Sequence, residues 1–134
     1  MSTMFDFGFG PVPAHQHPNG GGWVAGTAYV AETAYVELDA SVYGNAEVYG
    51  NAEVYGNARV FGNAWLFGKA RVFGKARVFN NAQVFDNAQV FDSALAYGNA
   101  EVYGNALVFD NAEVYGDTRV FDNAEVYGDT RVSE

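Results

Sequence analysis

Two histidines, His15 and His17, are the residues of this chain whose type and spacing best suit chemistry. They stand in the order His-Gln-His, and alternate side chains of an extended segment project to the same side. Two imidazoles on one side can share a metal ion, and three copies of the pair around an axis would supply six nitrogens for an octahedral iron, nickel or zinc-like site. His15 and His17 are therefore the candidate metal ligands, and the alternative is a plain loop.

Catalytic chemistry has little support elsewhere in the chain. There is no cysteine, and no histidine follows residue 17, so residues 18–134 offer neither a Ser-His nor a Cys-His pair for acyl transfer. We expect that the protein is not an enzyme and that it uses no cofactor besides the candidate metal ion. The net charge of −9 argues against nucleic acid as a partner. No apolar run is long enough to cross a membrane, so no membrane partner is expected.

A six-residue repeat makes up most of the chain and must position whatever the chain presents. From Val24 to Val132 every sixth residue is aliphatic or small, namely seventeen Val, Leu66 and Ala96. The residue two places earlier is Ala in sixteen repeats and Thr in two. A repeat this short and regular indicates a solenoid.

Each repeat combines a strand with a corner. Residues 52–55 (Ala-Glu-Val-Tyr) alternate between inward and outward side chains, which predicts a four-residue strand. The following Gly-Asn pair tolerates positive φ and predicts a corner. Three strands and three corners close one coil, so the sequence predicts a triangular prism with 18 residues and three short strands per coil, in about six coils.

The repeat resembles a known family. Residues 48–53 (Val-Tyr-Gly-Asn-Ala-Glu) show the hexapeptide pattern of an aliphatic first residue, Gly, Ala or an acid at the third place, and a small fifth residue. The chain resembles the hexapeptide-repeat proteins over residues 24–132. This resemblance implies an all-β, left-handed parallel β-helix for residues 23–134, with residues 1–22 as an extended N-terminal arm. It also implies a homotrimer, because three chains around an axis are the usual arrangement of this family.

The outward positions predict an interface. The residue after each core Val is aromatic in fifteen consecutive repeats from Tyr43 to Tyr127, and stacking every 18 residues sorts the rings into three ladders. So much apolar surface favours a covered wall, although ladders that satisfy themselves by stacking are the alternative. The predicted oligomer interface comprises one ladder and three outward apolar residues: Tyr49, Phe67, Phe85, Tyr103, Phe121, Trp65, Leu95 and Leu107.

Charge is distributed in bands along the prism. Five of the seven basic residues form a basic belt: Arg59, Lys69, Arg71, Lys75 and Arg77. The belt meets an acidic partner surface or is neutralised within the chain near Asp86 and Asp92. The register also predicts three stacked pairs of opposite charge, Glu53 with Arg71, Glu101 with Arg119, and Glu113 with Arg131. The acids near the C-terminus, Glu134 among them, are expected to keep the open end from stacking on another copy.

The N-terminal arm is the candidate docking element. Phe5, Phe7 and Phe9 alternate with small or polar residues, and Trp23 follows at the start of the repeat. An apolar extended arm of this kind suits docking on another protein, with these four rings as anchors; a disordered tail is the alternative.

These features predict a structural protein. Hexapeptide acyltransferases share the fold but use a histidine base that the coils lack here, and ice-binding β-helices display Thr arrays that the walls lack. The regular Tyr-Gly-Asn-Ala repeat behind a His-x-His-Pro-Asn-Gly-Gly-Gly leader resembles phage-encoded and prophage-encoded hexapeptide proteins, and His-x-His metal sites of phage spike tips. We therefore expect a virion component, most simply a capsid decoration protein. The alternatives are a tail or spike part, or a cytoplasmic bacterial scaffold protein that stacks end to end.

Overall fold

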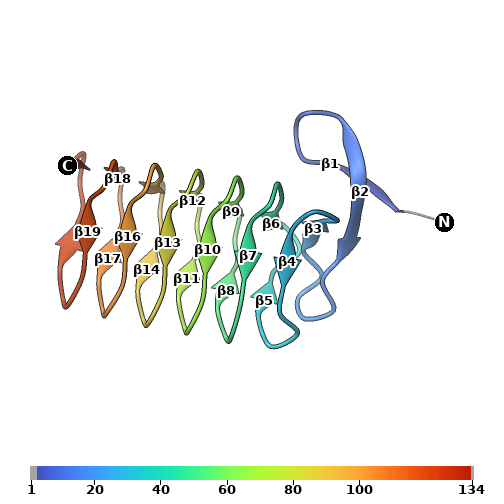
Figure 1. Cartoon of the computed structure of the whole chain (residues 1–134), viewed down its shortest axis with the longest axis horizontal. Helices are drawn as coiled ribbons and strands as arrows, with labels where there is room; N and C mark the ends of the chain where they lie inside the picture. The colour runs from blue at the N-terminus through green and yellow to red at the C-terminus, as the bar shows by residue number, and fades with distance from the viewer. Residues whose placement is uncertain (1–2, 134) are drawn as a thin grey trace.

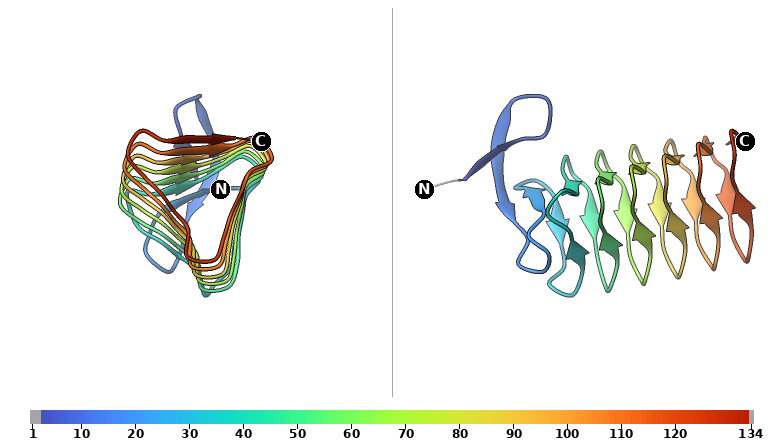
Figure 2. Two further views of the ribbon diagram at one scale, coloured as in Figure 1. Left: turned by 90° about the vertical axis from the view of Figure 1, so that its left-hand side faces the viewer. Right: turned by 180° about the vertical axis from the view of Figure 1, so that it is seen from behind.

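The computed structural model describes residues 3–133, so residues 1 and 2 of the predicted arm and the terminal acid Glu134 lie outside it. The described residues form twenty-one β-strands, and none forms a helix long and apolar enough to cross a membrane. The strands belong to three sheets that run along one axis (Figure 1). Seen along that axis, the coils have a triangular outline (Figure 2, left), which confirms the predicted prism.

The first wall is the nine-stranded sheet, in which the last seven strands belong to the prism. Its strands in spatial order are β1 (Met4–Asp6), β2 (Pro11–Gln16), β3 (Trp23–Ala25), β6 (Ser41–Val42), β9 (Arg59–Val60), β12 (Arg77–Val78), β15 (Leu95–Ala96), β18 (Glu113–Tyr115) and β21 (Arg131–Ser133).

The second and third walls have six strands each. The second wall contains β4 (Tyr29–Val30), β7 (Glu47–Val48), β10 (Trp65–Leu66), β13 (Gln83–Val84), β16 (Glu101–Val102) and β19 (Arg119–Val120). The third wall contains β5 (Tyr35–Val36), β8 (Glu53–Val54), β11 (Arg71–Val72), β14 (Gln89–Val90), β17 (Leu107–Val108) and β20 (Glu125–Val126).

Every coil pairs with the next in a parallel register of 18 residues, as between Val42 and Val60. Most strands of the coils are two residues long, and not four as the alternation predicts. The inter-coil hydrogen bonds nevertheless extend past the strand ends, since the N–H of Tyr43 donates to the carbonyl of Val60 at 3.0 Å. The aromatic residue thus keeps its bond to the next coil while the chain begins its corner.

The core is a column of Val and Ala that faces the prism axis. From Val36 to Val114 every residue of the Val column is fully buried, including Leu66 and Ala96. Ala96 stacks in register between Val78 and Val114, as the period predicts. Full burial of one such Val contributes about 1.5–3 kcal/mol, so the repeated column is the main source of stability.

The corners need residues that accept positive φ. Glycine fills most of them, with φ near +66° at Gly44 and Gly62. Asp replaces glycine at several later corners, as at Asp86 with φ 59°. Its side chain satisfies the next corner, because Oδ2 of Asp86 accepts from the N–H of Gly104 at 3.1 Å. This hydrogen bond offsets part of the cost of a left-handed conformation in a residue that carries a Cβ.

Candidate functional site at the hairpin-capped end

The N-terminal segment folds on its own chain. Strands β1 and β2 form an antiparallel hairpin, and β2 continues antiparallel to β3, with His15 opposite Val24. The hairpin projects beyond the first coil (Figure 2, right). The segment is therefore an ordered extension of the first wall, which differs from both a free extended arm and a disordered tail. The pairing itself explains the difference, because the open edge of β3 offers backbone hydrogen bonds to β2.

The predicted docking rings pack mainly against their own chain. Phe5 stacks on Trp23 with ring centroids 4.6 Å apart, and Phe7 stacks on Tyr43 at 4.9 Å. Phe7 is buried, whereas Phe9 is 61% exposed. The repeat position one coil before Tyr43 is Ala25, so the repeat has no aromatic ring there. Phe7 supplies the ring that stacks on Tyr43 instead. Of the four rings, Phe9 is the one that the hairpin leaves mostly free.

The three aromatic ladders form along most of their predicted length. Neighbouring rings lie nearly parallel, with centroids 4.8 Å apart for Tyr43 and Phe61, 4.7 Å for Phe67 and Phe85, and 4.7 Å for Tyr55 and Phe73. The exception is Tyr49, which is tilted by 42° against Tyr29, so the parallel stacking of the second ladder begins at Phe67. Ring faces are covered by stacking, so most of these side chains are half-buried and expose only their edges. Burial also raises the pKa of Tyr55, which the nearby Arg71 partly opposes.

The residues of the predicted oligomer interface do not share one surface. Trp65 lies on the second wall between Glu47 and Gln83, next to the ladder that runs from Tyr49 to Phe121. Leu95 lies on the first wall and Leu107 on the third. The 18-residue period already implied this separation, so an interface that includes all of these residues would have to involve all three walls. The interface itself stays a prediction.

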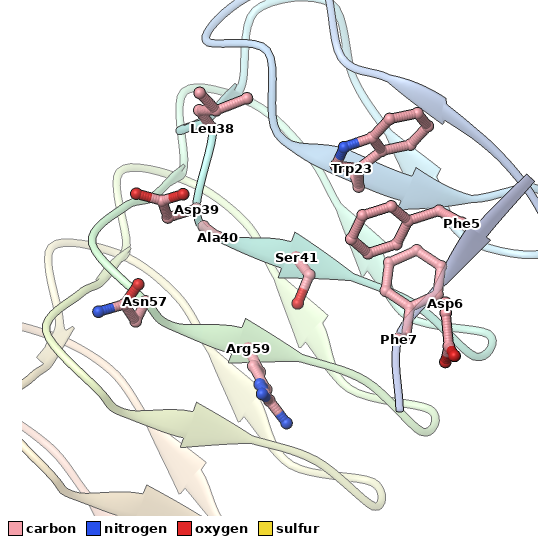
Figure 3. A pocket seen from close by; sticks show the side chains of 10 residues that line it. All are labelled: Phe5, Asp6, Phe7, Trp23, Leu38, Asp39, Ala40, Ser41, Asn57 and Arg59. Atoms are coloured by element: carbon pink, nitrogen blue, oxygen red, sulfur yellow. The ribbon is translucent and has the colours of Figure 1, made fainter. Parts of the chain in front are cut away.

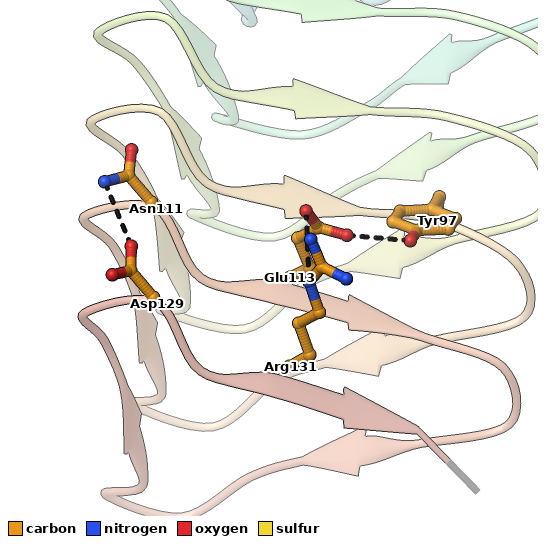
Figure 4. Close-up of polar contacts among 5 residues, drawn as sticks. All are labelled: Tyr97, Asn111, Glu113, Asp129 and Arg131. Carbon is orange, nitrogen blue, oxygen red and sulfur yellow. Dashed lines mark hydrogen bonds and ion pairs between the residues drawn. The ribbon is translucent and has the colours of Figure 1, made fainter.

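The predicted charge pairs form in register. The closest nitrogen–oxygen distances are 3.7 Å for Arg71 and Glu53, and 3.9 Å for Arg119 and Glu101. In the third pair Arg131 lies 3.7 Å from Glu113, which also accepts a hydrogen bond from the Tyr97 hydroxyl at 2.9 Å (Figure 4). Exposed pairs of this kind contribute little energy and mainly favour one register.

The basic belt is divided between walls and corners. Arg59 and Arg77 are neighbours on the first wall, so two like charges lie in register. Arg71 belongs to the third wall, and Lys69 and Lys75 occupy corners, where their N–H groups donate to the carbonyls of Asp86 and Asp92. Within residues 3–133, Arg71 is the one member of the belt with an ion pair.

His17 has a structural role that its sequence motif did not reveal. Its side chain is buried, and Nε2 donates to the carbonyl oxygen of Ala34 at 2.8 Å. The Asn19 amide donates to the same oxygen at 3.0 Å, and the N–H of Gly22 donates to the Val36 carbonyl at 2.8 Å. The loop of residues 17–22, which we name the cap loop, therefore covers the edge of β5. Its glycines allow this approach, because a Cβ on Gly20 would lie 2.3 Å from the Val36 oxygen.

The two histidines consequently lie in different environments. His15 is exposed on β2, whereas His17 follows the end of that strand and is buried. The hydrogen bond to Ala34 uses Nε2 of His17, so Nδ1 is the ring nitrogen that takes no part in this bond. In the part of the chain that the structure describes, no three His, Asp or Glu side chains gather closely enough to hold a metal ion. The shared metal site stays a prediction.

Two hollows flank the hairpin. One, of about 440 Å³, lies between the hairpin and the first wall, and we name it the hairpin hollow (Figure 3). Its lining includes Phe5, Asp6, Trp23, Asp39, Asn57 and Arg59. The other, of about 480 Å³, is apolar and is lined by Phe9, Val12, Pro13 and residues of the first two coils. The junction of hairpin and prism is therefore indented on two sides, which sequence periodicity alone could not indicate.

Comparison with known proteins supports the repeat. The family model described as the YdcK beta solenoid repeat matches residues 52–68, which is about one coil. No curated protein and no solved structure matches the chain. The match and the three stacked parallel sheets together agree with the hexapeptide pattern. The chain is a parallel β-solenoid repeat protein, and its stacked coils fit the left-handed parallel β-helix that the hexapeptide pattern predicts.

Proposed function

We propose that this chain is a non-enzymatic structural protein that docks on a larger assembly through its hairpin end. The observation that carries the proposal is the apolar surface of that end. Met4 is 50% exposed and Phe9 is 61% exposed, and an apolar hollow lies beside Phe9, Val12 and Pro13. Exposed apolar groups next to a hollow suit insertion of a partner's side chain.

The four anchors that the sequence suggested have separate roles in this proposal. Phe9 and Met4 contact the partner, whereas Phe5, Phe7 and Trp23 hold the hairpin in place through the stacking described above. A hairpin that is already ordered loses less conformational entropy on docking than a flexible arm would. The proposal therefore predicts tighter attachment than an arm that becomes ordered on contact would give.

The assembly that we favour is a phage virion, with this chain as a capsid decoration protein. The resemblance of the leader and the repeat to phage-encoded hexapeptide proteins supports this choice, as does a rigid prism that would project from a docked hairpin. A tail or spike part is the closest alternative. In either role the protein would be located in the virion, and the cytoplasm is the alternative location.

A homotrimer fits the same proposal. The second wall carries Trp65, which is 42% exposed, beside the ladder from Tyr49 to Phe121, and we favour this wall as the contact between copies. Three hairpins on one trimer would raise the overall affinity for a repetitive surface by avidity. Light scattering should give the mass of three chains, and a Trp65→Ser variant should dissociate. A wild-type monomer would contradict the trimer.

Head-to-tail stacking into a scaffold has less support. A second copy would have to add its last coil to the edge of β3, which β2 already occupies, and to the edge of β5, which the cap loop covers. Stacking of two C-terminal ends would bring acids together, among them Asp122, Glu125 and Asp129. These contacts favour docking over polymerisation.

A non-catalytic role agrees with the positions and contacts of the two histidines. His17 is bonded to the backbone in the cap loop, and His15 remains the exposed candidate for a metal ligand. Metal analysis of the purified protein should give about one ion per three chains if both histidines bind a shared ion as the sequence suggested. A metal-free protein would remove that part of the proposal.

The virion proposal is tested on particles purified from cells that encode the chain. Mass spectrometry should find the protein in stoichiometric amounts, and Phe9→Ser should remove it from the particles while the fold, followed by circular dichroism, is retained. Tyr127→Ser is the matched control, because Tyr127 is also exposed but lies at the opposite end. If the wild-type chain is absent from purified particles, the virion role is wrong. If Phe9→Ser stays bound, the hairpin is not the docking element.

A further inference from the structure

We propose that the hairpin hollow is a binding site for an uncharged saccharide. The hollow lies where the hairpin meets the first wall, so its lining comes from separate parts of the chain. Phe5 and Asp6 come from the hairpin, Trp23 comes from β3, and Asp39, Asn57 and Arg59 come from the following coils (Figure 3). Its volume of about 440 Å³ is within the usual range of small-molecule sites, about 300–1,000 Å³.

Arg59 differs from three other arginines of the coils, although Arg77 shares its lack of an ion pair within the described residues. Arg71, Arg119 and Arg131 each contact a Glu one coil earlier, whereas the neighbours of Arg59 in its column are Ser41 and Arg77. In residues 3–133 the Arg59 guanidinium has no ion pair. It therefore keeps its full set of hydrogen-bond donors for a ligand.

Asn57 differs from the corner Asn residues near the C-terminal end, although Asn63 has no side-chain hydrogen bond within the described residues either. At comparable corners Asn99 donates to Asp117 at 3.1 Å and Asn111 donates to Asp129 at 3.3 Å. The residue one coil after Asn57 is Lys75, which offers no acceptor. Nothing in the described part of the chain bonds the side chains of Asn57 or Asp39. Unpaired polar side chains from neighbouring coils thus converge on this hollow.

The hairpin contributes an apolar surface and a further acceptor. Phe5 and Trp23 stack at 14° between ring planes, and Phe7 meets Phe5 edge-on at 4.8 Å. Oδ1 of Asp6 accepts from the N–H groups of Gly8 and Gly10, which fixes the carboxylate and leaves Oδ2 for a ligand. The hollow consequently places fixed aromatic rings beside fixed hydrogen-bonding groups.

This combination fits a saccharide better than other ligand classes. The apolar faces of sugar rings pack on aromatic side chains, while their hydroxyls both donate and accept. Asp6 and Asp39 supply acceptors, Arg59 supplies donors, and Asn57 supplies both. Two carboxylates disfavour an anion, and the Arg59 guanidinium disfavours a cation. The planar carboxylate, amide and guanidinium groups suit paired hydrogen bonds to neighbouring hydroxyls.

The inference goes beyond the docking role and does not depend on it. Docking uses Met4 and Phe9 and the apolar hollow beside Phe9, whereas the saccharide would lie between Phe5 and the coils. A particle-bound protein would thereby gain a sugar-binding surface near its base. Loss of docking on Phe9→Ser and loss of sugar binding on a hollow variant are therefore separate outcomes.

The test starts from the full chain on an array of neutral mono- and oligosaccharides. A saccharide that binds is then titrated in solution against the wild type and four variants. Arg59→Ala and Asn57→Ala remove hollow groups, and Arg77→Ala and Asn63→Ala are their matched controls on the same kinds of position. We expect a Kd in the millimolar range or tighter, at least tenfold weaker binding in each hollow variant, and unchanged binding in each control. All four changes lie on exposed coil positions, and circular dichroism checks their folding.

Three results would overturn the proposal. One is a failure of every neutral saccharide to bind at millimolar concentration. Another is binding that Arg59→Ala and Asn57→Ala leave unchanged. The third is binding restricted to acidic saccharides and lost equally in Arg59→Ala and Arg77→Ala, which would transfer the site to the pair of arginines on the first wall.

Discussion

The two ends of the prism are finished in different ways. At the N-terminal end β2 pairs with β3, and the cap loop covers β5, so β4 is the one first-coil strand whose outer edge the described residues leave uncovered. At the C-terminal end β19, β20 and β21 are each the last strand of their sheet. The burial of the core valines differs accordingly. Val36 in the first coil is fully buried, whereas Val126 is 9% exposed and Val132 is half-buried.

The comparison shows how a repeat protein separates stability from specificity. Inside the prism each coil contacts its neighbours through identical positions, so a short motif suffices. The first and last described coils each have a neighbouring coil on one side. The N-terminal end covers its other side with irregular residues that form hydrogen bonds, whereas the C-terminal end keeps the motif and surrounds it with acids.

The largest expected effect concerns the glycines of the two ends. Gly20 and Gly128 both have positive φ, but an added Cβ meets the Val36 carbonyl at 2.3 Å in the first and nothing within 4 Å in the second. Gly20→Ala should therefore lower the free energy of unfolding by about 3 kcal/mol or more. Gly128→Ala should cost about 1–2 kcal/mol.

Hydrogen exchange of the first and last coils measures both changes separately. Protection should fall in the first two coils for Gly20→Ala and only in the last coil for Gly128→Ala. Equal losses of protection in the two variants would mean that the cap loop does not approach β5 as closely as described.

The histidines provide a second comparison, within the capped end itself. His17→Ala removes a buried donor to Ala34 and should cost about 1–3 kcal/mol. His15→Ala changes an exposed side chain and should stay within about 0.5 kcal/mol. Urea unfolding measures both. A His15→Ala cost as large as that of His17→Ala would indicate that the two rings act together, as a shared metal site requires.

Neutral side chains at the open end should weaken its protection against association. The triple variant Asp122→Asn, Glu125→Gln and Asp129→Asn removes charge from the last coil, with about 0.2–1 kcal/mol of repulsion relieved for each like-charge contact. We expect the mass from light scattering to rise with concentration. The control variant Glu32→Gln, Asp39→Asn and Glu47→Gln changes the charge equally near the capped end and should behave as wild type. Identical behaviour of the two triple variants would exclude a local role for the terminal acids.

The smallest expected effect is pH-dependent and lies near the open end. Burial, together with the hydrogen bond to Glu113, raises the pKa of Tyr97 above its usual value. A raised pKa in the folded state means that the neutral ring stabilises the fold fully below about pH 10, and that this contribution is lost as the pH rises through the folded pKa. Tyr97→Phe should cost about 0.5–1 kcal/mol at neutral pH.

The same variant should show a shallower loss of stability in alkaline solution, which urea unfolding between neutral pH and pH above about 10 would detect. Tyr103→Phe is the control, because Tyr103 stands in another ladder without a bond to Glu. A pH dependence that is equal in wild type and Tyr97→Phe would contradict the assigned hydrogen bond.

The repeat made most of the fold predictable. One period gave the coil length, the Val column, the stacking of Ala96, the ladders and the three charge pairs, because every such feature depends only on spacing. Strand length was predicted too long, since alternation of side chains continues through the aromatic residue while the backbone has begun to turn. The same spacing also places Leu95 and Leu107 on separate walls, and their role in an interface stays a prediction.

The capped end was not predictable in the same way. The Phe5, Phe7 and Phe9 alternation predicts an extended segment, but only Phe5 lies in a strand, because residues 7–10 form the bend between β1 and β2. Nothing local shows that β2 pairs with β3 of the same chain. The Pro-Asn-Gly-Gly-Gly run after His17 was the available signal, because several glycines in succession indicate close contact with another backbone. The hairpin hollow depends on the angle between hairpin and wall, which no periodicity contains.

Because the register is 18 residues, insertions of different length have different effects on the fold. Adding or removing a whole coil would change the height by about 4.8 Å and leave every wall in line. Adding a single hexapeptide would turn all following residues by a third of a revolution, so that Glu53 would no longer lie beside Arg71 and the ladders would exchange places. Repeat number in related sequences should therefore drift in multiples of three, while the capped end keeps its form.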